Sequence, residues 1–151
     1  MRYPNLSVQS FKYHISYWVG FVLFFSFIWG TYDQDYYRNF MVQIWSLPAR
    51  LTVVYVSWEV LFARFMGHQS FFKFLIHFFL LLVVVSILIQ RPIMIFVVEG
   101  VYLPYQSDRF FRITHLTNTI IDVGIAAIVP LSYKFYTVWR ESKSEIELLA
   151  A

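Results

Sequence analysis

The sequence predicts an all-α integral membrane protein, a four-helix bundle whose last helix extends out of the membrane. Hydrophobic residues make up 59% of the 151 residues and charged residues only 14%, whereas a soluble domain is nearer a quarter charged. The apolar residues form continuous stretches, unlike the alternating pattern of a membrane β-barrel. Phe, Tyr and Trp account for 22% of the chain, which suits a lipid-facing surface with aromatic belts at both interfaces.

Four apolar stretches are long enough to cross the hydrocarbon layer, which takes about 20 helical residues. They are residues 13–30, 40–62, 71–90 and 113–133. The first lacks the small-residue cleavage site of a secretory signal, so we expect it to remain as a helix. Residues 31–39 are expected to form a short loop. The apolar residues 92–100 are too few to cross again and either continue the third helix or lie in the interface.

Residues 134–151 contain no Gly or Pro and are mostly good helix formers. They predict that the fourth helix continues into water as the start of a signalling linker, cut before its end. Five residues follow the 4-3-4-3 spacing of a coiled-coil seam: Phe135, Trp139, Ser142, Ile146 and Leu149. The spacing predicts a homodimer, and an amphipathic helix lying in the interface is the alternative.

Basic residues predict the orientation. One predicted side carries Arg2, Lys12, Arg64, Lys73, Lys134, Arg140 and Lys143, and the other carries Arg38, Arg91, Arg109 and Arg112. The side with more basic residues is expected in the cytoplasm, which places both termini there.

The absence of Cys fits a bacterial inner membrane. The expected partner is the lipid bilayer, and the small net charge of +3 does not suggest nucleic acid.

Two ionisable residues fall at membrane depth, where a charge is costly unless it is paired or hydrated. Arg50 lies about ten residues into the second predicted span and Asp122 about nine into the fourth. Both spans run in the same direction, so the two side chains are expected at nearly equal depth. We predict a pair inside the bundle, serving either to fix the helix register or as a switchable, ligand-binding contact.

A second polar set comprises Glu59, His77, Lys73 and Arg64, near the connection between the second and third spans. These residues could meet across antiparallel helices, or they could be separate interfacial charges with extended side chains.

His14 and His77 could bind a haem between them. Interfacial hydrogen bonding is the simpler role for both histidines, and no cofactor is expected.

The outer loops offer a surface for receiving a stimulus. Its candidate residues are Asp33, Asp35, Arg38, Tyr102, Asp108 and Arg109. The loops are too short for a folded sensor domain, so the stimulus is expected to be small, lipidic, mechanical or delivered by another membrane protein. The sequence shows no nucleophile–base set, phosphate loop or metal-ligand spacing. We therefore predict no catalytic and no metal site within these residues.

Five parts of the chain carry a recognisable pattern: His14–Trp18, Leu47-Pro48, Tyr55, Glu59–Phe65 and Phe71–Phe74. Together they resemble the multi-pass membrane region of LytS/YehU-type sensor histidine kinases. Two positions depart from the family: Asn is frequent where Ser57 or Trp58 stands, and Pro where Ala63 stands. The resemblance implies a membrane sensor whose fourth helix leads to a phosphoacceptor His and an ATP-binding domain. It also implies a LytTR-type response regulator as the cytoplasmic partner. No kinase motif lies within this sequence.

The leading hypothesis from the sequence is the sensor and anchor domain of a two-component histidine kinase, which transmits a stimulus and carries no catalytic site. A small multi-pass transporter or transport subunit is the alternative, with Arg50 and Asp122 lining a solute or proton path. A membrane cytochrome is a third possibility.

Overall fold

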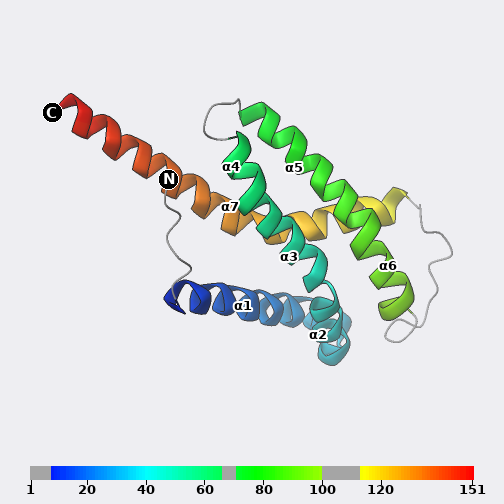
Figure 1. The fold of residues 1–151 in the computed structure, drawn as a ribbon. Coiled ribbons are helices and arrows are strands. Elements are labelled where there is room, and N and C mark those ends of the chain that lie inside the picture. The colour runs from blue at the N-terminus through cyan, green and yellow to red at the C-terminus, as the bar shows by residue number, and fades with distance from the viewer. Residues whose placement is uncertain (1–7, 66–70, 100–112) are drawn as a thin grey trace. The chain divides into compact units, whose positions relative to one another are not determined.

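Every element that the structure describes is a helix, so the predicted all-α class is confirmed. The structure is a computed structural model and describes residues 8–65, 71–99 and 113–151 (Figure 1). Three of its helical segments have the length and hydropathy of membrane spans: Phe11–Asp33, Phe71–Val97 and Leu116–Ala150. A helix satisfies its own backbone hydrogen bonds, which the hydrocarbon interior requires. These segments indicate a membrane protein.

The second predicted span, residues 40–62, is not among these three segments. Its residues belong to α2 (Tyr36–Trp45) and to a helical run that begins at Leu47. That run contains the charged residues Arg50, Glu59 and Arg64, which lower its hydropathy. That residues 40–62 cross the membrane stays a prediction.

The chain divides into two compact units, Met1–Trp45 and Ser46–Ala151. In the first unit, α1 (Val8–Asp33) and α2 form a helical hairpin. The connection is shorter than the predicted loop: Gln34 takes a left-handed φ of 58°, and Asp35 Oδ1 accepts the backbone N–H of Arg38 at 3.0 Å. A side chain in that position caps the start of a helix, so α2 begins at Tyr36.

The second unit starts with α3 (Leu47–Val56), the π-helical turn η1 (Ser57–Leu61) and α4 (Phe62–Phe65), which follow one another without a gap. Pro48 lies in the first turn of α3, where its missing N–H leaves no hydrogen bond unmade. This explains why the helix begins directly after Ser46.

The third helical segment runs from Phe71 to Glu99. It comprises α5 (Phe71–Val85), η2 (Ser86–Gln90), α6 (Arg91–Ile93) and η3 (Met94–Glu99). Residues 92–99 therefore continue the third helix, which decides between the two alternatives left open by the sequence.

The last element, α7 (Ile113–Ala150), is a single helix of 38 residues. Pro130 lies inside it and removes one backbone hydrogen bond without ending the helix. All residues from Trp139 onward are exposed. The helix therefore continues past the packed part of the unit, as the sequence predicts (Figure 1).

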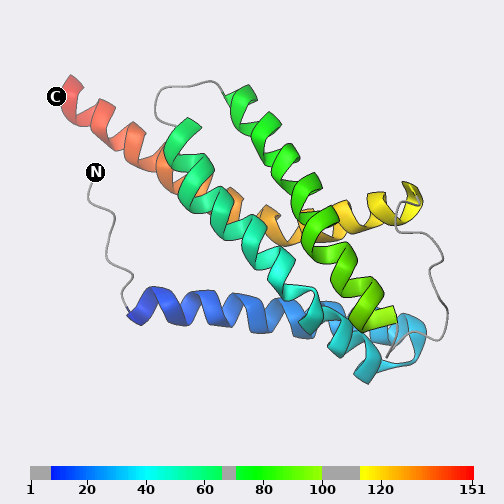
Figure 2. The same cartoon turned by 45° about the vertical axis from the view of Figure 1, so that its right-hand side comes forward.

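In the second unit, α3, α5 and α7 contact one another (Figure 2). Small apolar side chains form much of the common core: Ala49, Val53, Val54, Val85, Val123, Ala126 and Ala127. Phe135 closes one end of this core, with its ring centroid 4.5 Å from that of Phe62 and 5.5 Å from that of Phe74. These edge-on contacts hold the middle of α7 against α4 and α5.

Candidate functional site: a polar layer in the second unit

An ion pair between Arg50 and Asp122 joins α3 to α7. Arg50 Nη2 donates to both oxygens of Asp122, at 2.8 Å to Oδ1 and 2.9 Å to Oδ2. The two side chains differ in burial, because that of Arg50 is 1% exposed and that of Asp122 is 40% exposed. The structure thus brings together the two residues that their depth along the helices predicts to meet.

A hydrogen bond lies about one helical turn away from this ion pair. Gln90 Nε2 donates to Ser46 Oγ at 3.1 Å, and both side chains are buried. Arg50 follows Ser46 by four residues, and Ser86 precedes Gln90 by four residues on a helix of opposite direction. Residues four apart share one helix face. Ser86 therefore lies at about the level of Arg50.

Six residues make up this polar layer. They are Ser46, directly before α3, and Arg50, Ser86, Gln90, Thr119 and Asp122, which lie on the three contacting helical segments. All are buried except Asp122, which is half-buried. Such a layer fixes which helix faces meet, because any other register would leave its polar atoms facing hydrocarbon.

Sequence reasoning found Arg50 and Asp122 but missed the uncharged members of the layer. The available signal was the four-residue spacing of Ser46 to Arg50 and of Ser86 to Gln90 within apolar stretches. Sequence reasoning also placed Gln90 and Arg91 where the third span leaves the membrane. The structure buries both side chains, at 2% exposure, and the helix continues beyond them to Glu99.

The residues of the second polar set lie at the surface. Glu59, Arg64, Lys73 and His77 are all exposed on the second unit. His77 Nδ1 lies 2.7 Å from the backbone oxygen of Lys73, one turn earlier in the same helix. Glu59 forms no ion pair with any residue in the part of the chain that the structure describes. Whether these residues act together stays a prediction.

The outer-face candidates are partly described. Arg38 Nη2 lies 3.1 Å from Asp33 Oδ2, and Arg38 Nε lies 3.9 Å from Asp35 Oδ2. Asn39 Nδ2 also donates to Asp33 Oδ2. The Asp33 contacts join the end of α1 to the first turn of α2. The remaining candidates, Tyr102, Asp108 and Arg109, lie outside the described residues.

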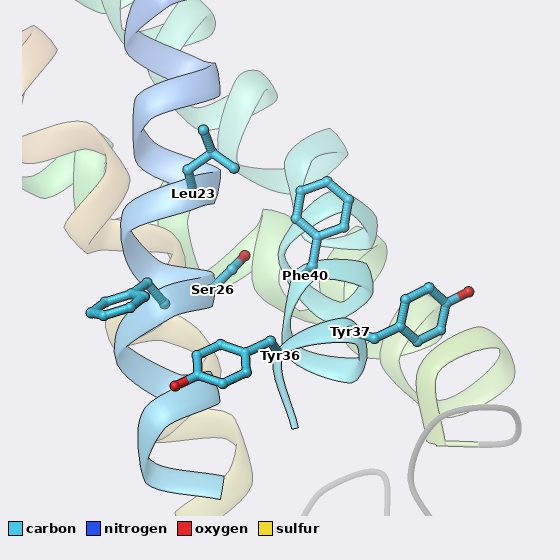
Figure 3. A pocket seen from close by; sticks show the side chains of 6 residues that line it. Leu23, Ser26, Tyr36, Tyr37 and Phe40 are labelled. Atoms are coloured by element: carbon cyan, nitrogen blue, oxygen red, sulfur yellow. The ribbon is translucent and has the colours of Figure 1, made fainter. Parts of the chain in front are cut away.

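A groove of about 560 Å³ lies between α1 and α2. Its lining residues are Leu23, Ser26, Phe27, Tyr36, Tyr37 and Phe40 (Figure 3). Ser26 Oγ donates to the backbone oxygen of Val22, and the Tyr36 hydroxyl lies 3.2 Å from that of Thr31. Two of the groove's polar groups thus have partners within the hairpin, and the groove itself is predominantly apolar.

The predicted dimer seam begins inside the packed unit. Phe135 is occupied by its contacts with Phe62 and Phe74, whereas Trp139, Ile146 and Leu149 are 59%, 66% and 88% exposed. Ser142 is exposed as well. Within this chain, the seam residues left for a partner helix are therefore the four from Trp139 onward.

No protein-family model matches the chain, and neither a curated protein nor a solved structure matches it. Among the residues that the structure describes, no three metal-ligating side chains gather. The geometry of the chain itself is therefore the basis for a functional proposal.

Proposed function

We propose that this chain is the membrane sensor and anchor portion of a two-component histidine kinase of the LytS/YehU type. One observation carries the proposal: a single helix, α7, holds a residue of the polar core and also forms the exposed extension. Asp122 and Ala150 are separated by 28 helical positions, or roughly 42 Å along the axis. A movement at the polar layer is thereby connected to the far end of the helix.

The Arg50–Asp122 contact provides the coupling in this proposal. Arg50 is fixed by burial on α3, while the half-buried Asp122 side chain belongs to the helix that leads outward. A stimulus that displaces α3 relative to α7 repacks this contact and shifts or rotates α7. Small displacements of packed helices are an established way of passing signals between domains. The chain transmits the movement, and catalysis belongs to a kinase region that follows it.

The partners and location follow from the same proposal. The exposed seam residues Trp139, Ile146 and Leu149 pair with a second copy as a coiled coil. A LytTR-type response regulator receives the phosphoryl group from the kinase region. The distribution of basic residues supports a bacterial inner membrane with both termini in the cytoplasm.

The gene and the full-length product provide the test. The reading frame is expected to continue past Ala151 into a His-containing dimerisation helix and an ATP-binding domain. The full-length protein in membranes is expected to incorporate the γ-phosphate of ATP into that histidine. A stop codon directly after Ala151 would contradict the proposal, as would a downstream domain unrelated to phosphoryl transfer.

The polar layer also favours a second candidate, a small transporter in which Arg50 and Asp122 line a solute or proton path. Ionisable residues inside a membrane bundle are frequently part of such a path. Proteoliposomes containing the protein separate the two functions. Uptake of a solute or proton that is lost in Asp122→Asn would support transport, and no uptake is expected for the sensor.

A further inference from the structure

Ser86 is a buried serine without the hydrogen bond that helical serines usually form. In hydrophobic helices, a serine or threonine hydroxyl commonly bonds to the backbone oxygen four residues earlier, as Ser26 does with Val22 and Thr52 with Pro48. Ser86 is 0% exposed, and its Oγ has no hydrogen-bond partner in the described part of the chain. A buried hydroxyl without a partner is destabilising, so a partner of another kind is expected there.

The helix is widened at this residue. Ser86 is the first residue of the π-helical turn η2, and its backbone oxygen accepts the N–H of Arg91, five residues later. Such turns are often found at functional sites, and ladders of helical hydrogen bonds are opened by inserted side chains or water. The turn contacts both α3 and α7, the two helices that carry the ion pair.

Gln90 presents a second such atom on the same face. Its Nε2 donates to Ser46 Oγ, while its Oε1 is buried and has no partner among the residues described. Ser86 and Gln90 are four residues apart, so both atoms face the polar layer. Gln90 Oε1 can only accept a hydrogen bond, and Ser86 Oγ can donate or accept.

We propose that the polar layer binds water, held by Ser86 Oγ and Gln90 Oε1 and entering beside Asp122. The Asp122 side chain is 40% exposed and gives the layer its connection to the surface of the unit. Water donates to Gln90 and exchanges hydrogen bonds with Ser86 and the carboxylate. The charge of Arg50 disfavours a cation at this place, and the oxygens of Gln90 and Asp122 disfavour an anion. Water is the small ligand that all of these groups accept.

The bound water links the third helical segment to the ion pair between the other two. A hydrated pair is weaker than a dry one and exchanges partners more readily. The polar layer then becomes a contact that can rearrange at membrane depth. This inference concerns hydration of the core and does not depend on the proposed signalling function.

The sign of a stability change tests the proposal. If Ser86 Oγ binds water, Ser86→Ala removes a satisfied group and lowers the melting temperature by about 2–4 °C. If the site is dry, the same change removes an unsatisfied hydroxyl and raises the melting temperature. Alanine also favours a helix more than serine does. Ser132→Ala, at an exposed position of α7, measures that contribution so that it can be subtracted.

An infrared probe tests hydration directly, because the chain contains no cysteine that would also be labelled. Ser86→Cys and Val85→Cys are each converted to the thiocyanate, and the nitrile stretch is recorded in lipid nanodiscs. Val85 is buried one residue away and serves as the dry reference. A hydrogen-bonded, higher-frequency band at position 86 alone is expected. The proposal requires this band and the lowered melting temperature, and it is overturned by matching bands at both positions or by a raised melting temperature.

Discussion

Removing either partner of the Arg50–Asp122 pair is expected to destabilise the protein by different amounts. Asp122→Asn leaves the guanidinium of Arg50, which is 1% exposed, without its carboxylate. Loss of one partner of a buried ion pair costs about 3–5 kcal/mol. Arg50→Gln instead leaves a carboxylate that is 40% exposed and, with water in the polar layer as proposed above, can be solvated in part. Its cost is expected to be smaller, about 1–3 kcal/mol.

The double variant isolates the contact itself. With Arg50→Gln and Asp122→Asn combined, no uncompensated charge remains. The loss in free energy of unfolding in the double variant is therefore expected to be smaller, by about 1–3 kcal/mol, than the sum of the losses in the two single variants. Unfolding by sodium dodecyl sulfate in mixed micelles, followed by tryptophan fluorescence, measures all four free energies. Additive losses would refute the pairing. Equal losses for the two single variants would refute the argument from their unequal burial.

Two further predictions concern the hairpin of the first unit and the exposed end of α7. A Cβ added at Gly30 would lie 2.5 Å from Tyr36 Cδ1, whereas a Cβ added at Gly20 would meet nothing within 4 Å. Gly30→Ala is therefore expected to lower the melting temperature by several degrees, and Gly20→Ala is expected to leave it unchanged or to raise it. Equal melting curves for the two variants would contradict this packing. A single cysteine introduced at Leu149, on the predicted seam, is expected to form a disulfide-linked dimer under mild oxidation several times faster than a single cysteine at Glu147. Equal rates of disulfide formation would show that the exposed helix does not pair through this seam.

The fold class was predictable because its cause is distributed along the whole chain. A long, continuous apolar stretch in a membrane satisfies its backbone hydrogen bonds as a helix, because the strands of a membrane barrel alternate between apolar and polar residues. The continuation of the fourth helix past Tyr133 was predictable for a similar reason, since no residue there disfavours a helix. Gln34 was not foreseen as a turn residue, because its left-handed φ depends on contacts with its neighbours in the hairpin.

The candidate site was predictable only where charge marked it. A charge in hydrocarbon requires a partner, so Arg50 and Asp122 could be matched by depth alone. Ser46, Ser86 and Gln90 carry no charge and are tolerated on many helix faces. Their burial follows from how three segments pack, which spacing along one segment does not determine. The widened turn at Ser86 likewise has no sequence signal that distinguishes it from an ordinary helical turn.

The central claim is that the Arg50–Asp122 contact controls the output carried by α7. Autophosphorylation of the full-length protein in nanodiscs, with radiolabelled ATP, tests it most directly. Asp122→Asn is expected to change the initial rate at least about fivefold, the factor that corresponds to a coupling free energy of about 1 kcal/mol, the weak end of the usual range. Ile128→Val, at an exposed position of the same helix, is expected to leave the rate unchanged. Equal rates for the wild-type protein and Asp122→Asn would contradict the claim.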